Sequence, residues 1–229
     1  MEAIVLAGGL GTRLAARLHG LPKSMAPVAG RPFLEILLAQ LQRAGCARVL
    51  LSVGHLHAVI QARFGASFVG MSLAYVIEES PLGTGGAIRN TLPLAEENSV
   101  LVLNGDTFLN ADYAAMLRFH LAEAAPLTMA VTRQPDIARY GGVVIESRRI
   151  TGFEEKGRSG PGWINAGVYV FDRQIEWPPD LPQKFSIETD FLAPHVARLS
   201  PAAYEVDGFF LDIGVPEDLD RAQTELARF

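Results

Sequence analysis

The stretch Ile4-Val5-Leu6-Ala7-Gly8-Gly9-Leu10-Gly11-Thr12-Arg13-Leu14 decides the fold of this chain. Its apolar beginning is too hydrophobic for an exposed edge strand, which predicts a buried parallel strand. The three glycines that follow let the backbone turn sharply and come close to a ligand. Arg13 lies just beyond them, where a guanidinium group could bind phosphate oxygens as a fork. The stretch therefore predicts an anion-binding turn after the first strand.

Several kinds of turn place glycines after a strand. The P-loop is excluded, because no Gly-Lys pair follows the glycines. The dinucleotide fingerprint fits only as Gly9, Gly11 and Leu14, and it requires a small residue where Leu14 stands. The remaining alternatives are a third kind of nucleotide loop, considered below, and a plain strand-to-helix turn.

Composition narrows the class of protein. The 229 residues can bury a real core, and 49% hydrophobic and 20% charged residues are typical of a globular enzyme. A net charge of -5 argues against a nucleic-acid-binding surface, so phosphate chemistry must rest on a local cluster of Arg and Lys. The lone Cys46 excludes an internal disulfide and fits the cytoplasm. We expect no signal peptide and no membrane span.

The order of expected elements predicts an α/β fold. Strands at 4–6, 49–53, 73–77 and 100–104 alternate with helices at 33–44, 56–64 and 87–92. This order implies one Rossmann-like, doubly wound, mostly parallel sheet with helices on both faces. Beyond Asp106 we expect a mixed β part, with helices at 113–123 and 217–227. We interpret residues 1–229 as one domain, with a nucleotide-binding half (about 1–110) and an acceptor-binding half (about 111–229).

Two aspartates are placed to hold a metal ion. Asp106 follows the most apolar strand, and Asp212 lies between another apolar run and a Gly-x-Pro turn. Ligands of open α/β sheets bind at the carboxyl ends of strands. Mg²⁺ takes only one or two carboxylates and completes its shell with water and phosphate oxygens. The pair therefore predicts an Mg²⁺ site, with helix capping as the simpler alternative for Asp106.

Other polar residues point to an anionic substrate. Lys23 follows the glycine turn closely, and Lys156 ends the stretch Phe153-Glu154-Glu155-Lys156. Both lysines could neutralise phosphate, although an ordinary solvated lysine is the more common case. Glu155 and Asn165 lie in strand-like stretches and suggest partners for sugar hydroxyls, or else satisfied strand-end groups.

Several motifs together resemble one family. They follow one another in the order found in sugar-1-phosphate nucleotidyltransferases, over nearly the whole chain: 6–14, Pro22-Lys23, 81–86, 104–106, 140–143, 153–156, 165–167 and 212–214. Within that family, stretches 81–87, 185–190 and 212–218 resemble the guanylyltransferases that act on D-glycero-α-D-manno-heptose 1-phosphate. Val215 stands where many members have Thr, and Gly141-Gly142 stand where many have one glycine.

The resemblance implies a role for each matching residue. Arg13 and Lys23 would bind the nucleotide phosphates, and Lys156 would bind the sugar phosphate. Asp106 and Asp212 would hold Mg²⁺. The nucleotide would lie against Leu6, Gly8, Gly9, Gly11, Thr12, Gly83 and Thr84, and the sugar against Gly142, Glu155 and Asn165.

The implied reaction transfers a nucleoside monophosphate, GMP from GTP in the favoured case, to a sugar 1-phosphate. A carboxylate only accepts hydrogen bonds, and guanine offers two adjacent donors, so Glu78 facing the base would favour guanine; a solvated glutamate pair with Glu79 is the alternative. The other interpretations are a mannose-1-phosphate guanylyltransferase, a uridylyl- or thymidylyltransferase for a hexose 1-phosphate, and a catalytically silent nucleotide-sugar-binding domain. Exposed strands in the second half would permit a homodimer.

Overall fold

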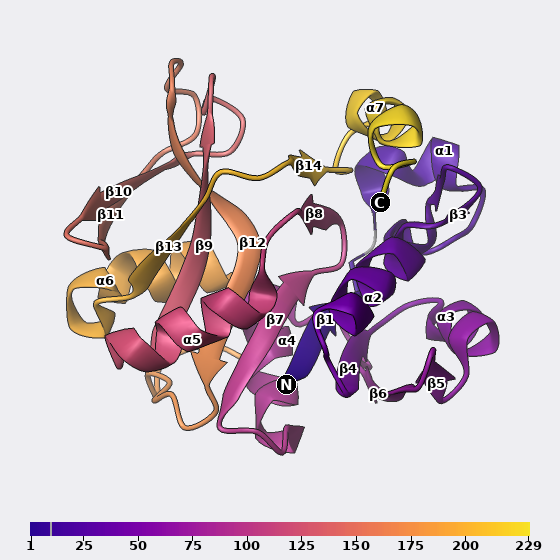
Figure 1. Cartoon of the computed structure of the whole chain (residues 1–229), viewed down its shortest axis with the longest axis horizontal. Coiled ribbons are helices and arrows are strands. Elements are labelled where there is room, and N and C mark those ends of the chain that lie inside the picture. The colour runs from indigo at the N-terminus through magenta and orange to yellow at the C-terminus, as the bar shows by residue number, and fades with distance from the viewer. Residues whose placement is uncertain (10) are drawn as a thin grey trace.

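Strand β1 (Glu2–Leu6) lies inside a ten-stranded sheet with the order β10-β11-β13-β9-β12-β7-β1-β4-β6-β5 (Figure 1). The fold is that of a computed structural model, and it describes residues 1–9 and 11–229. Ala3, Ile4 and Val5 are fully buried. The apolar start of the chain therefore forms the buried strand that the sequence predicts.

The first half of the sheet is parallel. β1 pairs in parallel with β4 (Arg48–Val53) and β7 (Ser99–Asn104), and β4 pairs in parallel with β6 (Met71–Ile77). The short β5 (Ser67–Phe68) closes this edge in antiparallel fashion. The predicted succession of strands and crossover helices is confirmed here, and the carboxyl ends of β1, β4, β6 and β7 meet at one edge.

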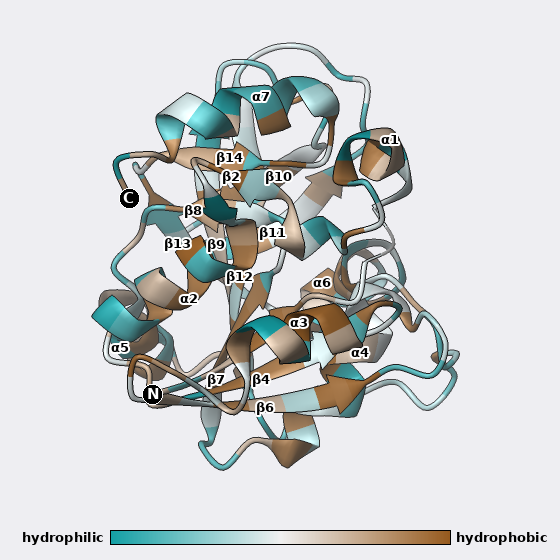
Figure 2. Ribbon diagram, turned by 90° about the vertical axis from the view of Figure 1, so that its right-hand side faces the viewer, coloured by the Kyte–Doolittle hydropathy of each residue, from teal (hydrophilic) through white to brown (hydrophobic). Residues whose placement is uncertain are grey.

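Helices cover both faces of the sheet, as expected. One apolar cluster includes residues of α2, α3, α5 and α7, and a second, on the other face, includes residues of α4 and α6. Brown, apolar stretches run along the central strands between these layers (Figure 2). The helices are α1 (Ala15–Leu18), α2 (Phe33–Arg43), α3 (His57–Phe64), α4 (Gly83–Thr91), α5 (Tyr113–Glu123), α6 (Ala193–Leu199) and α7 (Pro216–Glu225).

The second half of the sheet is mixed, as expected beyond Asp106, but it makes the sheet as a whole mixed and not mostly parallel. β12 (Gly162–Asp172) pairs antiparallel with both β7 and β9 (Leu127–Gln134), and β10 (Gly142–Glu146) pairs antiparallel with β11 (Arg149–Glu154). No helix joins β9, β10, β11 and β12; the short turn between β10 and β11 makes these two strands an antiparallel hairpin. The class is α/β, but the sheet is mixed.

The same strands curl round on themselves. β10 contacts β12 at Val143 and Trp163, and β11 contacts β13 (Ala202–Val206) at Arg149 and Ala202. β13 returns to β9 in parallel, so the pairings of these strands form a ring. These strands therefore form a closed ring and not a flat extension of the sheet.

Residues 17–31, which are rich in glycine and proline, carry only short elements. The stretch contains the end of α1, a 3₁₀ turn at Lys23–Met25 and a small hairpin of β2 (Pro27–Val28) and β3 (Arg31–Pro32). These elements are too short and too rich in glycine and proline to show a helical or strand periodicity in the sequence. No helix among the described residues is long and apolar enough to cross a membrane.

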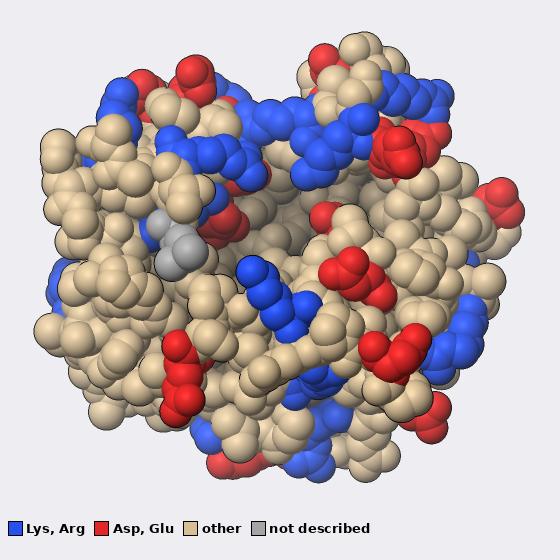
Figure 3. Space-filling model, turned by 180° about the vertical axis from the view of Figure 1, so that it is seen from behind, with Lys and Arg blue, Asp and Glu red and all other residues tan. Residues whose placement is uncertain are grey.

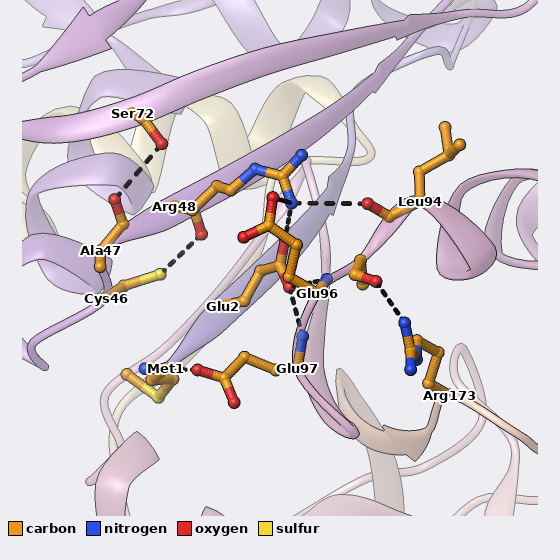
Figure 4. Close-up of polar contacts among 11 residues, drawn as sticks. Met1, Glu2, Cys46, Ala47, Arg48, Ser72, Leu94, Glu96, Glu97 and Arg173 are labelled. Atoms are coloured by element: carbon orange, nitrogen blue, oxygen red, sulfur yellow. Dashed lines mark hydrogen bonds and ion pairs between the residues drawn. The ribbon is translucent and has the colours of Figure 1, made fainter.

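A buried carboxylate anchors the edge of the sheet opposite the carboxyl ends of the strands (Figure 4). Glu2 is only 2% exposed. Its Oε1 accepts a hydrogen bond from the Arg48 guanidinium at 2.5 Å, and its Oε2 accepts the backbone N–H groups of Glu96 and Glu97 at 2.7 and 3.0 Å. The carboxylate thereby ties β1 to β4 and to the segment before β7.

We expect Glu2→Ala to lower the free energy of unfolding by about 3 kcal/mol, because it leaves a guanidinium and two N–H groups without their acceptor. Chemical denaturation measures this loss. Glu96→Ala is the matched control, since its carboxylate also contacts Arg48, at 3.2 Å, but is 79% exposed; it should cost less than ~1 kcal/mol. Equal losses in both variants would contradict this role of burial.

Candidate active site

The two predicted metal-binding aspartates lie side by side. Asp106 directly precedes β8 (Thr107–Leu109), which pairs antiparallel with β14 (Phe210–Asp212) and places Asp212 opposite Thr107. The Ile213 N–H donates to the Asp106 carbonyl at 3.0 Å and locks the two segments together. The sequence predicts that both aspartates lie at strand ends, but it does not indicate that β8 and β14 pair.

Cations balance this pair of carboxylates. The Lys23 Nζ lies 2.5 Å from Asp106 Oδ2. Arg139 contacts Asp212 Oδ2 at 3.8 Å and forms a close ion pair with the nearly buried Asp218 of α7. Burial and the nearby Asp106 carboxylate raise the pKa of Asp212, and Lys23 and Arg139 oppose that rise. The pair of aspartates is thus an acidic site that gains from an added positive charge.

All the predicted nucleotide-binding residues line one cavity of about 390 Å³, which we call the loop cavity. It lies at the carboxyl ends of β1, β6 and β7. Asn104, Asp106 and Lys184 also line it. The predicted residues are Leu6, Gly8, Gly9, Gly11, Thr12, Glu78, Gly83 and Thr84.

The glycines of the first loop differ in what a side chain at each position would contact. A Cβ at Gly8 would lie 2.8 Å from Glu78 Oε1, and Gly11 has a φ of +60° and would meet the Lys23 side chain. The backbone conformation therefore favours glycine at position 11, and a side chain at position 8 would displace the Glu78 carboxylate. Gly9 lies outside the left-handed region, and a Cβ there would meet no atom of the described chain within 4 Å. Its side toward the cavity is open for a ligand.

The second glycine stretch serves packing as well as the cavity. Gly83 has a φ of +69°, and its Cβ would lie 2.5 Å from the Phe185 carbonyl oxygen. That carbonyl accepts the Gly85 N–H at 3.0 Å. Thr84 Oγ1 accepts the Ile187 N–H at 3.0 Å. These glycines let residues 183–187 lie directly on the start of α4, a purpose that the sequence pattern did not indicate.

A second, smaller cavity of about 160 Å³ adjoins the loop cavity, and we call it the charged cavity. It shares Thr84 and Asn104 with the loop cavity. Its cations are Arg13, Lys156 and Arg139, and Asp212 also lines it. Arg13 and Lys156 thus line the same cavity, whereas the family resemblance implies that Arg13 binds the nucleotide phosphates; Arg13 does not line the loop cavity.

A third cavity of about 440 Å³, the outer cavity, continues from the charged cavity into the curved second half. The two share Tyr140, Lys156, Asn165 and Glu188. The predicted sugar-binding residues Gly142, Glu155 and Asn165 all line it. Gly141 lines it too, and a Cβ at Gly141 or Gly142 would collide with Glu154, so both glycines also have a packing reason.

Two functional candidates are not recognisable from the sequence. Arg139 lies in the loop between β9 and β10, and only its contact with Asp212 of β14 distinguishes it from a surface arginine. Glu188 lies in a π-helical turn, Ile187–Leu192, before α6. In the sequence, Glu188 belongs to the motif at 185–190, which by itself indicates no role for this residue.

Figure 3 shows a hollowed face of the molecule with Lys and Arg side chains along its upper rim and at its centre, and with acidic side chains between them. The chain as a whole is acidic. The predicted local cluster of cations is therefore present. Among the described residues no group of three or more His, Cys, Asp or Glu side chains could hold a metal ion. A two-carboxylate site is accordingly the arrangement to consider.

The topology and the side chains at the strand ends define an α/β protein with cations and two aspartates around adjoining cavities. Comparison with known families narrows the class: the family described as "Nucleotidyl transferase" matches residues 2–228, and the chain belongs to this family. The resemblance inferred from the sequence motifs is confirmed.

Known relatives cover the whole chain. It is 40% identical over 229 residues to a D-glycero-alpha-D-manno-heptose 1-phosphate guanylyltransferase of Aneurinibacillus thermoaerophilus, with 100% of both chains covered. It is 41% identical to a protein of the same name from Campylobacter jejuni, covering 95% of this chain and 96% of the relative. The crystal structure of HddC from Yersinia pseudotuberculosis complexed with GMP-PN is similar, with 34% identity, a TM-score of 0.84 and coverage of 98% and 99%.

We expect Asp212→Asn to raise the melting temperature in EDTA at pH 7.5 by about 2–4 °C. Because the pKa of Asp212 is raised in the folded protein, its ionisation destabilises the fold as the pH rises through the ordinary value of 3.8, and the penalty is complete above the raised pKa. The exposed Asp207→Asn is the control and should change nothing. A lower melting temperature for Asp212→Asn would contradict this electrostatic description.

We expect Gly9→Ala to fold normally and to raise KM for the nucleotide about tenfold or more, because its methyl group would enter the loop cavity without straining the backbone. Steady-state kinetics and thermal denaturation measure the two effects. Gly152→Ala, in β11, is the matched control: its methyl would make only ordinary contacts, at 3.7 Å to Val144. An unchanged KM in Gly9→Ala would contradict close approach of the nucleotide.

Proposed function

We propose that this chain transfers GMP from GTP to D-glycero-α-D-manno-heptose 1-phosphate, giving GDP-heptose and pyrophosphate. The relatives that match it over nearly its full length carry the name of this activity. The observation that carries the proposal is the continuity of the loop cavity and the charged cavity through Thr84 and Asn104, beside both aspartates. Two reactants bound in the two cavities would meet there.

The chemistry needs positioning and charge neutralisation more than a base. The phosphate of a sugar 1-phosphate, with a second pKa near 6, is already largely dianionic at neutral pH and can attack the α-phosphorus itself. The task is to hold two polyanions in line. In our proposal Arg13, Arg139 and Lys156 bind the sugar phosphate in the charged cavity. Lys184 and Lys23 lie on the nucleotide side.

Asp106 and Asp212 fit a divalent cation. They supply two carboxylates, both partly exposed, and burial together with the nearby Asp106 carboxylate raises the pKa of Asp212. This donor set is what Mg²⁺ prefers. When bound, Mg²⁺ would neutralise triphosphate charge. Lys23 holds Asp106 in place and supplies part of that charge itself.

Glu78 is placed to read the nucleotide base. Its Oε1 accepts the Ser52 hydroxyl at 2.9 Å and its Oε2 accepts the Leu82 N–H at 3.1 Å. Each oxygen keeps one further lone pair for the adjacent donors of guanine. Glu78 lies between the loop cavity and a further cavity of about 440 Å³ at the ends of β4 and β6, which His55 and His57 also line. A purine has room at this boundary.

The two halves of the chain line different cavities. We propose one domain in which residues 1–110 supply most of the nucleotide site and residues 111–229 most of the sugar-phosphate site, with Lys184 reaching back into the loop cavity. The cytoplasm stays the expected compartment, and a homodimer stays a prediction. Both rest on the sequence analysis.

Pyrophosphate release tests the proposed activity. The purified chain is incubated with each nucleoside triphosphate and either heptose 1-phosphate, mannose 1-phosphate or glucose 1-phosphate, with and without Mg²⁺. The proposal predicts the highest kcat/KM for GTP with heptose 1-phosphate, and only with Mg²⁺. Preference for mannose 1-phosphate, or for UTP or dTTP, would establish one of the alternative transferases, and no release with any pair would favour a silent binding domain.

We expect Glu78→Gln to reduce the preference for GTP over UTP by about tenfold, because one of its two acceptor oxygens becomes a donor. The ratio of kcat/KM values for the two nucleotides measures this change. Glu79→Gln, at the exposed neighbouring position, serves as the control. Unchanged selectivity in Glu78→Gln would remove Glu78 from base recognition.

A further inference from the structure

We propose that Glu188 binds a hydroxyl group of the sugar 1-phosphate and thereby determines which sugar is accepted. The inference rests on the proposed function and adds a residue to it. Glu188 lines both the charged cavity and the outer cavity, so it lies where the phosphate end and the sugar end of the acceptor meet. Its carboxylate has one oxygen engaged by the protein and one available.

The engaged oxygen is held by Asn165. Asn165 Nδ2 donates to Glu188 Oε1 at 2.6 Å and also to the buried Tyr169 hydroxyl at 2.6 Å. Asn165 Oδ1 accepts the Gly167 N–H at 2.9 Å. Both amide hydrogens of Asn165 are therefore used within the protein. Asn165, expected to orient the sugar directly, is better placed to orient Glu188.

The other carboxylate oxygen is open to a ligand. Within residues 1–9 and 11–229, no group of the protein donates a hydrogen bond to Glu188 Oε2. A carboxylate accepts hydrogen bonds and repels phosphate, so its natural partner in this cavity is a hydroxyl group. A hydrogen bond to a charged acceptor is also stronger than a neutral one.

The charges of the two cavities orient the acceptor. Arg13 and Arg139 line the charged cavity, whereas Glu154 and Glu155 line the outer cavity; Lys156 and Glu188 border both. A phosphate dianion is attracted to the first and an uncharged polyol is suited to the second. The sugar ring consequently lies with its hydroxyls toward the carboxylates of the outer cavity, past Glu188.

The turn that carries Glu188 is fixed on both sides. The Ile187 N–H donates to Thr84 Oγ1 at 3.0 Å, and the Ser186 N–H donates to Asp190 Oδ2 at 2.7 Å. Thr189 N–H donates to the Ser186 hydroxyl at 3.3 Å, which caps the turn. These bonds set the carboxylate in place before substrate binds, as selective recognition of one hydroxyl requires.

The test compares deoxygenated substrates in the wild type and in Glu188 variants. The kcat/KM of the full chain with GTP and Mg²⁺ is measured for heptose 1-phosphate and for its monodeoxy analogues. In the wild type, removal of the hydroxyl bound by Glu188 should lower kcat/KM about 10- to 100-fold. In Glu188→Gln that penalty should shrink to a few-fold, and in Glu188→Ala it should vanish. The penalties of all other deoxygenations should stay as in the wild type.

The controls separate this role from a structural one. Glu205→Gln, on the exposed side of β13, should leave every penalty and the KM for GTP unchanged. If Glu188→Ala is too unstable to assay, Glu188→Gln alone decides, since its amide oxygen can still accept from Asn165. Deoxygenation penalties in Glu188→Gln that all equal those of the wild type would overturn the inference. A wild type that makes no GDP-heptose would instead contradict the proposed function.

Discussion

The pairing of β8 with β14 is the constraint on which the rest of the site depends. It brings Asp212 opposite Thr107, beside Asp106, although the two aspartates are separated by more than a hundred positions in the chain. Burial and the neighbouring Asp106 carboxylate raise the pKa of Asp212, so the two carboxylates repel each other. Lys23 and Arg139 offset that repulsion, and a divalent ion would offset it further.

Each cation reaches this pair from a different part of the chain. Lys23 comes from the 3₁₀ turn after the glycine loop, and Arg139 comes from the loop that joins β9 to β10. Arg139 also pairs with Asp218 at the start of α7, which Arg221 contacts in turn at 3.0 Å. Ion pairs thus join the first loop, the loop between β9 and β10 and the C-terminal helix around the two aspartates. In our proposal the same cations also neutralise the substrates.

The parts that local pattern decides could be predicted from the sequence. The apolar run of β1, the helix α2 with its glycine stop and the exact span of α5 follow from composition and periodicity. Most residues predicted for the loop cavity were implied by the resemblance to a known family, and Glu78 was suggested by the hydrogen-bond donors of guanine. The aspartates were recognisable because each follows an apolar strand.

Long-range pairing could not be predicted. Nothing in the sequence of β12 shows that it runs antiparallel beside β7, and β13 and β14 are too short to give a clear period. For the same reason Arg139 and Glu188 stayed hidden, since their partners Asp212 and Asn165 are brought to them only by tertiary structure. The glycines at 83–86 had a second purpose, packing against Phe185, that only the three-dimensional contact shows.

The most direct measurement is a count of bound Mn²⁺ by electron paramagnetic resonance, in the presence of a non-hydrolysable GTP analogue. Two aspartates that share one cation predict a single tightly bound Mn²⁺ per chain, lost to the same extent in Asp106→Asn and in Asp212→Asn. If either variant kept the bound ion with unchanged affinity, the two carboxylates would not form one site, and the account of this active site would be wrong.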